Sequence, residues 1–80
     1  MEKQKALELI SQALRATLKD PTVQAKPGSD LFRDGVLDSL DGMVFFLELS
    51  GLTSKQFPEK DLVELGFFNV DKLVDFISAD

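Results

Sequence analysis

The chain of 80 residues contains no cysteine and no histidine. Without cysteine it forms no disulfide bond, no thiolate metal site and no cysteine nucleophile. Without histidine it lacks the usual general base near neutral pH, and a Ser-His-Asp triad is excluded. With no plausible base, nucleophile pair or metal site, we expect a protein that is not an enzyme.

Long apolar runs are also missing. No stretch approaches the ~20 apolar residues of a membrane-spanning helix. The first residues are charged and lead into an amphipathic pattern rather than into the apolar core of a secretory signal. We therefore expect a cytoplasmic protein.

The composition is that of one small globular domain covering residues 1–80. The apolar fraction of 44% is ordinary for a folded protein, and 80 residues are too few for two separate cores. The net charge of −5 is unevenly spread, because residues 1–29 carry +2 and residues 30–80 carry −7. The acidic part favours basic protein surfaces over nucleic acid as partners, and we expect a monomer.

Apolar residues at spacings of three and four predict a first helix from about Glu2 to Leu18. Asp20-Pro21 should end it, because the residue before a proline disfavours the helical region. Residues 20–38 then form a connection unusually long for a small domain, which suggests function or internal packing. Four apolar residues are expected to pin this loop onto the helices: Leu31, Phe32, Val36 and Leu37.

A second helix is predicted from Ser39 to about Ser50, with Asp38 as its N-cap and Gly51 as its stop. Further along, Pro58 suits the start of a short third helix, Glu59–Leu65, which Gly66 closes. Asn69 should cap a fourth helix, with its apolar face formed by Val70, Leu73, Val74 and Ile77. No strand-like alternation or repeat is found. The predicted fold is all-α, a four-helix bundle of three longer helices and one short helix, with the long loop between the first two.

The second predicted helix is apolar on nearly all sides. On a helical wheel one arc, expected to face the core, holds Gly42, Phe45, Phe46, Leu49 and Leu52. The opposite arc holds Leu40, Met43, Val44 and Leu47. A domain this small has little room to bury both, so Met43 and Leu47 are expected to offer an exposed apolar surface to partner proteins. In the alternative interpretation, the third helix and the long loop cover this arc.

Ser39 is the main candidate for chemistry. It follows a flexible loop and opens an apolar helix, where unpaired N–H groups and the helix dipole favour a phosphate. A phosphodiester-linked arm on Ser39 would make the chain a carrier. Read alone, Asp38-Ser39-Leu40 is also consistent with a simple N-cap followed by a first-turn residue. A catalytic serine is disfavoured, because no lysine lies near it in sequence and histidine is absent.

A calcium loop is the remaining alternative. Residues Asp30 to Asp41 span twelve positions, with Asp34 and Gly35 placed as in an EF-hand. However, Phe32 stands where the third ligand belongs, and Asp41 replaces the long bidentate glutamate. We therefore predict no metal site.

The chain resembles the acyl carrier protein family, including its peptidyl and D-alanyl carrier branches. The resembling segments are Leu31-Phe32-Arg33-Asp34-Gly35-Val36-Leu37-Asp38-Ser39-Leu40-Asp41, the helix that follows, Phe57-Pro58 and Asn69-Val70-Asp71. Together they extend over essentially the whole chain.

The resemblance implies that a phosphopantetheinyl transferase attaches 4′-phosphopantetheine, taken from coenzyme A, to Ser39. The thiol of this arm would hold an acyl or aminoacyl group as a thioester. Further partners would be a loading ligase and a downstream acyltransferase or synthase. Five residues match positions that contact partners in the family: Asp38, Leu40, Asp41, Met43 and Leu47.

The cargo and the pathway stay open at this stage. The fatty acid carriers that the chain resembles usually have a markedly acidic recognition helix, whereas the second predicted helix here carries only Asp41 and Glu48 as acids. This departure from the family pattern implies a dedicated carrier serving one or a few enzymes. Five phenylalanines either fill or line the space that a long chain would need: Phe45, Phe46, Phe67, Phe68 and Phe76. The rival function is an unmodified acidic helical module that binds a partner through the exposed face of its second helix.

Overall fold

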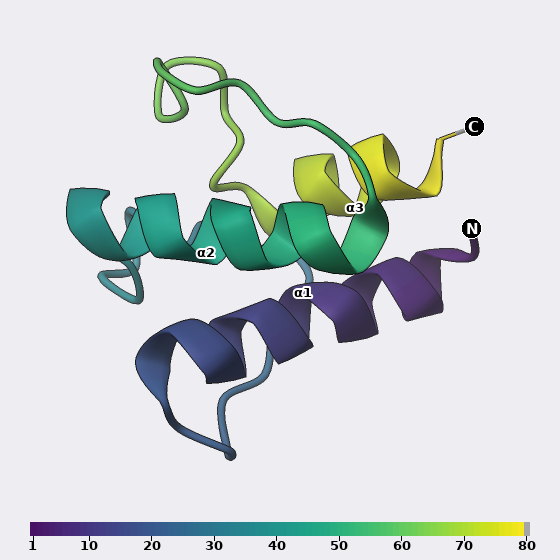
Figure 1. Ribbon diagram of the computed structural model, residues 1–80, viewed down its shortest axis with the longest axis horizontal. Coiled ribbons are helices and arrows are strands. Elements are labelled where there is room, and N and C mark those ends of the chain that lie inside the picture. Colours follow the sequence, from purple (N-terminus) through teal and green to yellow (C-terminus); the bar gives the residue numbers. More distant parts are fainter. Residues whose placement is uncertain (80) are drawn as a thin grey trace.

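The computed structural model describes residues 1–79, which form three α-helices (Figure 1). These are α1 (Lys3–Leu18), α2 (Ser39–Thr53) and α3 (Val70–Ser78). In Figure 1, α1 and α2 lie antiparallel, and α3 lies at the end of the pair where the N-terminus is found. The all-α class is confirmed: within residues 1–79 the only β-type pairing is an isolated bridge between Asp30 and Asn69. None of the helices in this range has the length and apolar character needed to cross a membrane.

The first helix agrees with its prediction. It ends at Leu18, because Lys19 adopts the left-handed conformation (φ 55°) and its N–H donates to the Arg15 carbonyl. Its inward face is formed by buried residues at helical spacing: Ala6, Leu9, Ile10, Ala13 and Leu14. This face packs on both α2 and α3.

The start of α2 is confirmed, but its predicted stop at Gly51 is wrong. The Asp38 carboxylate accepts a hydrogen bond from the Asp41 N–H at 2.7 Å, which makes it the N-cap. At the other end the helix continues through Gly51 to Thr53, and Ser54 is the residue with positive φ (57°). A glycine inside a helix costs only about 1 kcal/mol, so it does not by itself end one.

Residues 54–69, which we call the connecting segment, arch over α2 in Figure 1. The short helix predicted for residues 59–65 is not confirmed, since this stretch consists of bends and hydrogen-bonded turns. Asp61 has φ 60°, which a right-handed helix does not accommodate. The Leu65 N–H donates to the Asp61 carbonyl at 2.9 Å, forming one turn that Gly66 (φ 77°) closes.

The last helix begins as predicted. The Asn69 side chain accepts a hydrogen bond from the Lys72 N–H at 3.0 Å. The buried face of α3 consists of Val70, Leu73 and Ile77. A high density of apolar residues at spacings of three and four therefore positions this short helix against α1.

All seven phenylalanines belong to one network of ring contacts. Phe46 is one hub, with centroids 5.0 Å from Phe45 and 5.4 Å from both Phe57 and Phe68. Phe57 is the other, since it also contacts the rings of Phe67 and Phe76. The network joins α2, α3 and the connecting segment, so these phenylalanines fill the space between the elements.

Hydrogen bonds fix the long loop to α1 and to the region where α3 begins. The buried Ser11 hydroxyl on α1 accepts a hydrogen bond from the Ala25 N–H at 2.9 Å. Near α3, the Gly28 N–H donates to Asp71, and the Leu31 N–H donates to the Phe68 carbonyl at 2.8 Å. Leu31 and Leu37 are buried, and Phe32 and Val36 pack against the core, as predicted. Internal packing therefore accounts for the length of this loop.

Candidate functional site

Ser39 is the first residue of α2, and its side chain is exposed. The backbone before it is held in place, because Leu37 is buried and its N–H donates to the Leu31 carbonyl at 2.9 Å. Asp38 occupies the N-cap position next to it. Within residues 1–79, no side chain makes a hydrogen bond to the Ser39 hydroxyl. The serine thus projects from a fixed frame while its oxygen stays accessible.

The two acidic residues of the site lie at the N-terminus of α2, Asp38 as its N-cap and Asp41 in its first turn. Asp38 is exposed and Asp41 is partly buried. Both carboxylates stand near the positive end of the helix dipole, where a negative charge is stabilised. Only Asp38 uses its carboxylate to cap the helix.

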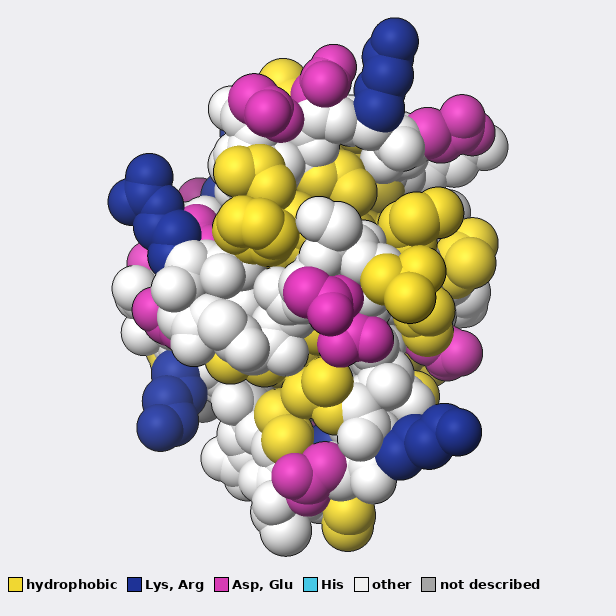
Figure 2. Space-filling view, turned by 90° about the vertical axis from the view of Figure 1, so that its left-hand side faces the viewer, with side chains coloured by type: hydrophobic (Ala, Val, Ile, Leu, Met, Phe, Trp, Pro, Cys, Tyr) yellow, Lys and Arg dark blue, Asp and Glu magenta, His cyan; other side chains and the backbone are white. Residues whose placement is uncertain are grey.

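The outer face of α2 is apolar and exposed, as the wheel predicts. Leu40, Met43 and Leu47 expose 71%, 64% and 75% of their surface, so neither the long loop nor the connecting segment covers them. Figure 2, which looks at the end of the molecule where α2 begins, shows apolar side chains next to acidic ones. An apolar surface bordered by acids suits a partner that is both apolar and basic.

Leu52 differs from its prediction. It was placed with the core arc, yet it is exposed, while Gly42, Phe45, Phe46 and Leu49 are buried. On the wheel, Leu52 stands at the edge of that arc beside the polar strip of Asp41, so a small rotation of the helix leaves it in solvent.

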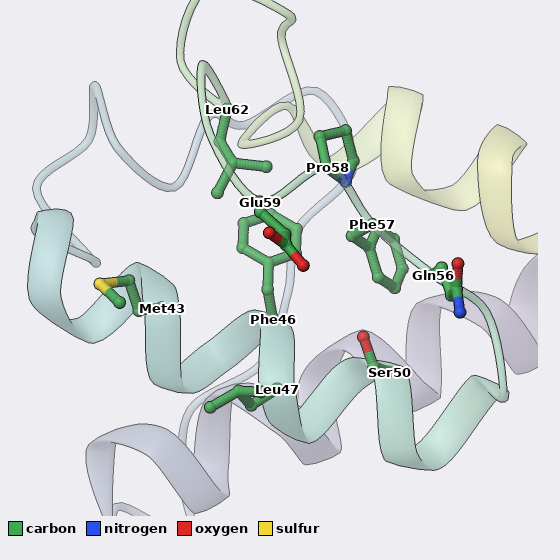
Figure 3. Close-up of a pocket in the computed structure, with 9 residues that line it drawn as sticks. All are labelled: Met43, Phe46, Leu47, Ser50, Gln56, Phe57, Pro58, Glu59 and Leu62. Carbon is green, nitrogen blue, oxygen red and sulfur yellow. The ribbon is translucent and has the colours of Figure 1, made fainter.

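A groove of about 600 Å³ runs between α2 and the connecting segment (Figure 3). Met43, Phe46, Leu47 and Ser50 line it from α2. The opposite wall is formed by Gln56, Phe57, Pro58, Glu59 and Leu62. The sequence did not reveal this second wall, because we interpreted the stretch only as a short helix. The available signal was Phe57-Pro58, an aromatic residue next to a turn-forming one.

Asp30 and Asp34 organise the loop rather than stand free as ligands. Asp30 accepts hydrogen bonds from the N–H groups of Phe32 (3.0 Å) and Arg33 (2.9 Å). Asp34 accepts one from the Asp30 N–H at 3.3 Å. In the described part of the chain, no three acidic residues come together in a group that could hold a metal ion.

No protein-family model, curated protein or solved structure gives a significant match to this chain. The interpretation of the site therefore depends on its own geometry and on the motif around Ser39.

Proposed function

We propose that the chain is a carrier of the acyl carrier protein type, with 4′-phosphopantetheine attached to Ser39. The supporting observation is the exposed Ser39 hydroxyl at the first residue of α2, within the Asp-Ser-Leu sequence. In the attachment reaction the serine oxygen forms a bond to the phosphorus that bears the pantetheine arm. The pyrophosphate bond of coenzyme A breaks, and the nucleotide leaves as adenosine 3′,5′-bisphosphate.

The arm would carry an acyl or aminoacyl group as a thioester on its terminal thiol. A thioester is a reactive acyl donor, and tethering raises its effective concentration at a partner's active site. The carrier needs no catalytic group of its own for this role.

The partners would be a phosphopantetheinyl transferase, a loading ligase and a downstream acyltransferase or synthase. Three exposed side chains on the outer face of α2 support docking there: Leu40, Met43 and Leu47. Asp38 and Asp41 add negative charge at the same end, which favours fast association with basic surfaces and release at moderate salt.

Two finer proposals accompany this function. We place the protein in the cytoplasm, where coenzyme A and loading enzymes are found.

We also propose that residues 59–65 become the fourth, short helix of the bundle when a partner binds. The hydrogen bond from the Leu65 N–H to the Asp61 carbonyl already has helical i→i−4 spacing. An amide-exchange experiment with and without the transferase would detect the added protection.

The deciding experiment is the intact mass after incubation with coenzyme A, magnesium and a promiscuous phosphopantetheinyl transferase. The wild-type chain should gain one phosphopantetheine, and Ser39→Ala should gain none while keeping its helical circular dichroism. Ser29→Ala is the matched control, and it should gain the same mass as wild type because Ser29 lies in the loop, hydrogen-bonded to the Lys26 carbonyl. No mass gain with this transferase or with one from the source organism would overturn the proposal.

The exposed face of α2 also supports a second candidate, an unmodified helical module that binds a partner directly. Ser39→Ala separates the two functions. A carrier loses all cargo transfer with this substitution, whereas an interaction module keeps its partner affinity. Leu47→Asp would weaken partner binding in either case.

A further inference from the structure

The groove beside α2 points to a chemical class of cargo. We propose that it receives the side chain of an apolar aminoacyl group, whose free α-amine pairs with the Glu59 carboxylate. This inference rests on the carrier function proposed above, since the cargo would arrive on the Ser39 arm.

The floor of the groove limits how deep a cargo can go. Phe46 lines it from α2 and is only 6% exposed. Its ring lies against those of Phe45, Phe57 and Phe68 at centroid distances of 5.0 to 5.4 Å. Because the space beneath is filled by packed rings, a long alkyl chain would have to remain in the open groove, in contact with water.

The walls suit an apolar side chain. Met43 and Leu47 lie on the α2 side, and Leu62 descends from the connecting segment toward them (Figure 3). Burying a leucine-sized side chain against such a surface contributes favourable transfer free energy, and methionine adapts its shape to the occupant.

Glu59 supplies the polar part of the recognition. It is the one ionisable residue that lines the groove, and its side chain extends from the connecting segment toward the middle of the groove in Figure 3. No salt bridge to Glu59 is found within residues 1–79. Glu59 is exposed, so an alkyl cargo gains nothing from its carboxylate, whereas an ammonium group would pair with it at the rim of the groove.

The arm can reach this position. Leu47 lies eight residues after Ser39 on the same helix, which corresponds to about 12 Å of helical rise. The pantetheine arm is as long as roughly four to five residues of extended chain, about 15 Å. A cargo on its thiol therefore comes within reach of the groove without any movement of the helices.

The first experiment uses free probes, so that it does not depend on modification of Ser39. Leucinamide is titrated into the wild-type chain at about pH 6.5, where its amine is protonated, and the Met43 and Leu62 methyl resonances are followed by NMR. The neutral control probe is 4-methylpentanamide, which has the same carbon skeleton without the amine. We expect leucinamide to bind more tightly.

Two variants that each remove one negative charge test whether Glu59 causes the preference for leucinamide. Glu59→Gln should weaken leucinamide binding about two- to fivefold, the fold-change of an exposed ion pair, and leave 4-methylpentanamide unchanged. Glu48→Gln removes the same charge from α2 outside the groove and should leave both probes unchanged. Equal binding of the two probes, or equal effects of the two variants, would overturn the inference.

A second experiment uses the loaded chain. The transferase moves the loaded phosphopantetheine arm from leucyl-coenzyme A or 4-methylpentanoyl-coenzyme A to Ser39, with adenosine 3′,5′-bisphosphate as the leaving group, and intact mass verifies the attachment. When the mass gain is seen, we expect only the leucyl form to shift the Met43 and Leu62 methyl resonances, and Glu59→Gln to abolish this shift. Identical spectra for the two loaded forms would overturn the cargo assignment while the carrier function stands. No mass gain with either loaded or free coenzyme A, from this transferase and from one of the source organism, would overturn the carrier function and the cargo assignment with it.

Discussion

A side-chain carbon placed on Gly42 would lie 2.8 Å from Cζ of Phe68. This close approach brings the connecting segment against α2, on the buried side of the helix that begins at Ser39. The Phe68 ring has little freedom to withdraw, because it packs between Phe32 and Phe46 with both centroids at 5.4 Å.

Gly42→Ala should therefore destabilise the protein, by about 1–3 kcal/mol of overpacking. Gly51→Ala is the matched control in the same helix. A Cβ there meets nothing within 4 Å, so alanine should stabilise by about 0.5–1 kcal/mol through helix propensity. Urea unfolding monitored by circular dichroism gives both free energies. Similar effects from the two alanines would show that the contact with Phe68 does not constrain the helix.

Ser11→Ala should cost about 1–3 kcal/mol of unfolding free energy. Ser11 is 3% exposed, and its hydroxyl donates to the Leu7 carbonyl and accepts from the Ala25 N–H. Alanine leaves the Ala25 N–H buried without an acceptor, which carries the full desolvation penalty. Ser78→Ala, which removes only bonds within its own helix, should change stability by less than about 0.5 kcal/mol. If both variants unfold at the same urea concentration, the bond to the loop contributes nothing.

Two substitutions of Asp38 should distinguish its role as the N-cap of α2 from a role in recognition by the transferase. Asp38→Ala removes the N-cap of α2 and should destabilise by about 1 kcal/mol, whereas Asp38→Asn keeps an acceptor and should be close to neutral. If the transferase recognises the charge, Asp38→Asn slows modification of Ser39 while the fold stays intact. The rate of Ser39 modification, measured by mass spectrometry, is compared with urea unfolding curves of the same variants. A modification rate for the asparagine variant equal to wild type would assign Asp38 a capping role alone.

Asp20 should make the free energy of unfolding fall as the pH is lowered into the acid range. The hydroxyl of Thr22 donates to its carboxylate at 2.7 Å, and the Thr22 N–H donates at 2.9 Å; together they lower the pKa of Asp20 below its ordinary value of 3.8. A lowered carboxyl pKa adds stability above the unfolded pKa, which is lost as the pH falls through the folded pKa.

Thr22→Val removes the first of these bonds and should raise the pKa of Asp20 toward its ordinary value. Its destabilisation should be larger at pH 7 than at a pH below the folded pKa, because the carboxyl is then protonated in both the folded and the unfolded state. NMR titration of the Asp20 carboxyl carbon measures the pKa directly. Thr17→Val, whose hydroxyl bonds only to the Ala13 carbonyl, should show no such pH dependence.

The starts of α2 and α3 were predictable because each depends on neighbouring residues. Asp38 and Asn69 both cap the helices assigned to them, since a short polar side chain before an apolar run satisfies the first free N–H groups. The exposed position of Met43 and Leu47 also followed from helical spacing.

The connecting segment was not predictable in the same way. Its course depends on Phe57, Phe67 and Phe68, which pack against rings of α2 and α3. This packing outweighs the local preference for a helix that Pro58 suggested. The groove was missed for the same reason, because a site between two elements exists only once their spacing is known. The path of the long loop likewise depends on contacts to α1 and α3 that no local pattern encodes.

The long loop also links Ser39 to the region where α3 begins. Gly28 and Asp71 are 43 positions apart, yet their hydrogen bond, together with that from Leu31 to Phe68, fixes the loop that leads to Ser39. Closing the chain between contacts of such sequence separation is entropically unfavourable, so they form only when the packing of the folded state offsets this cost. The final setting of the serine therefore depends on residues that lie beside and within the first turn of α3. A transferase that reads this setting would act as a checkpoint, attaching an arm to folded molecules and passing over incomplete ones.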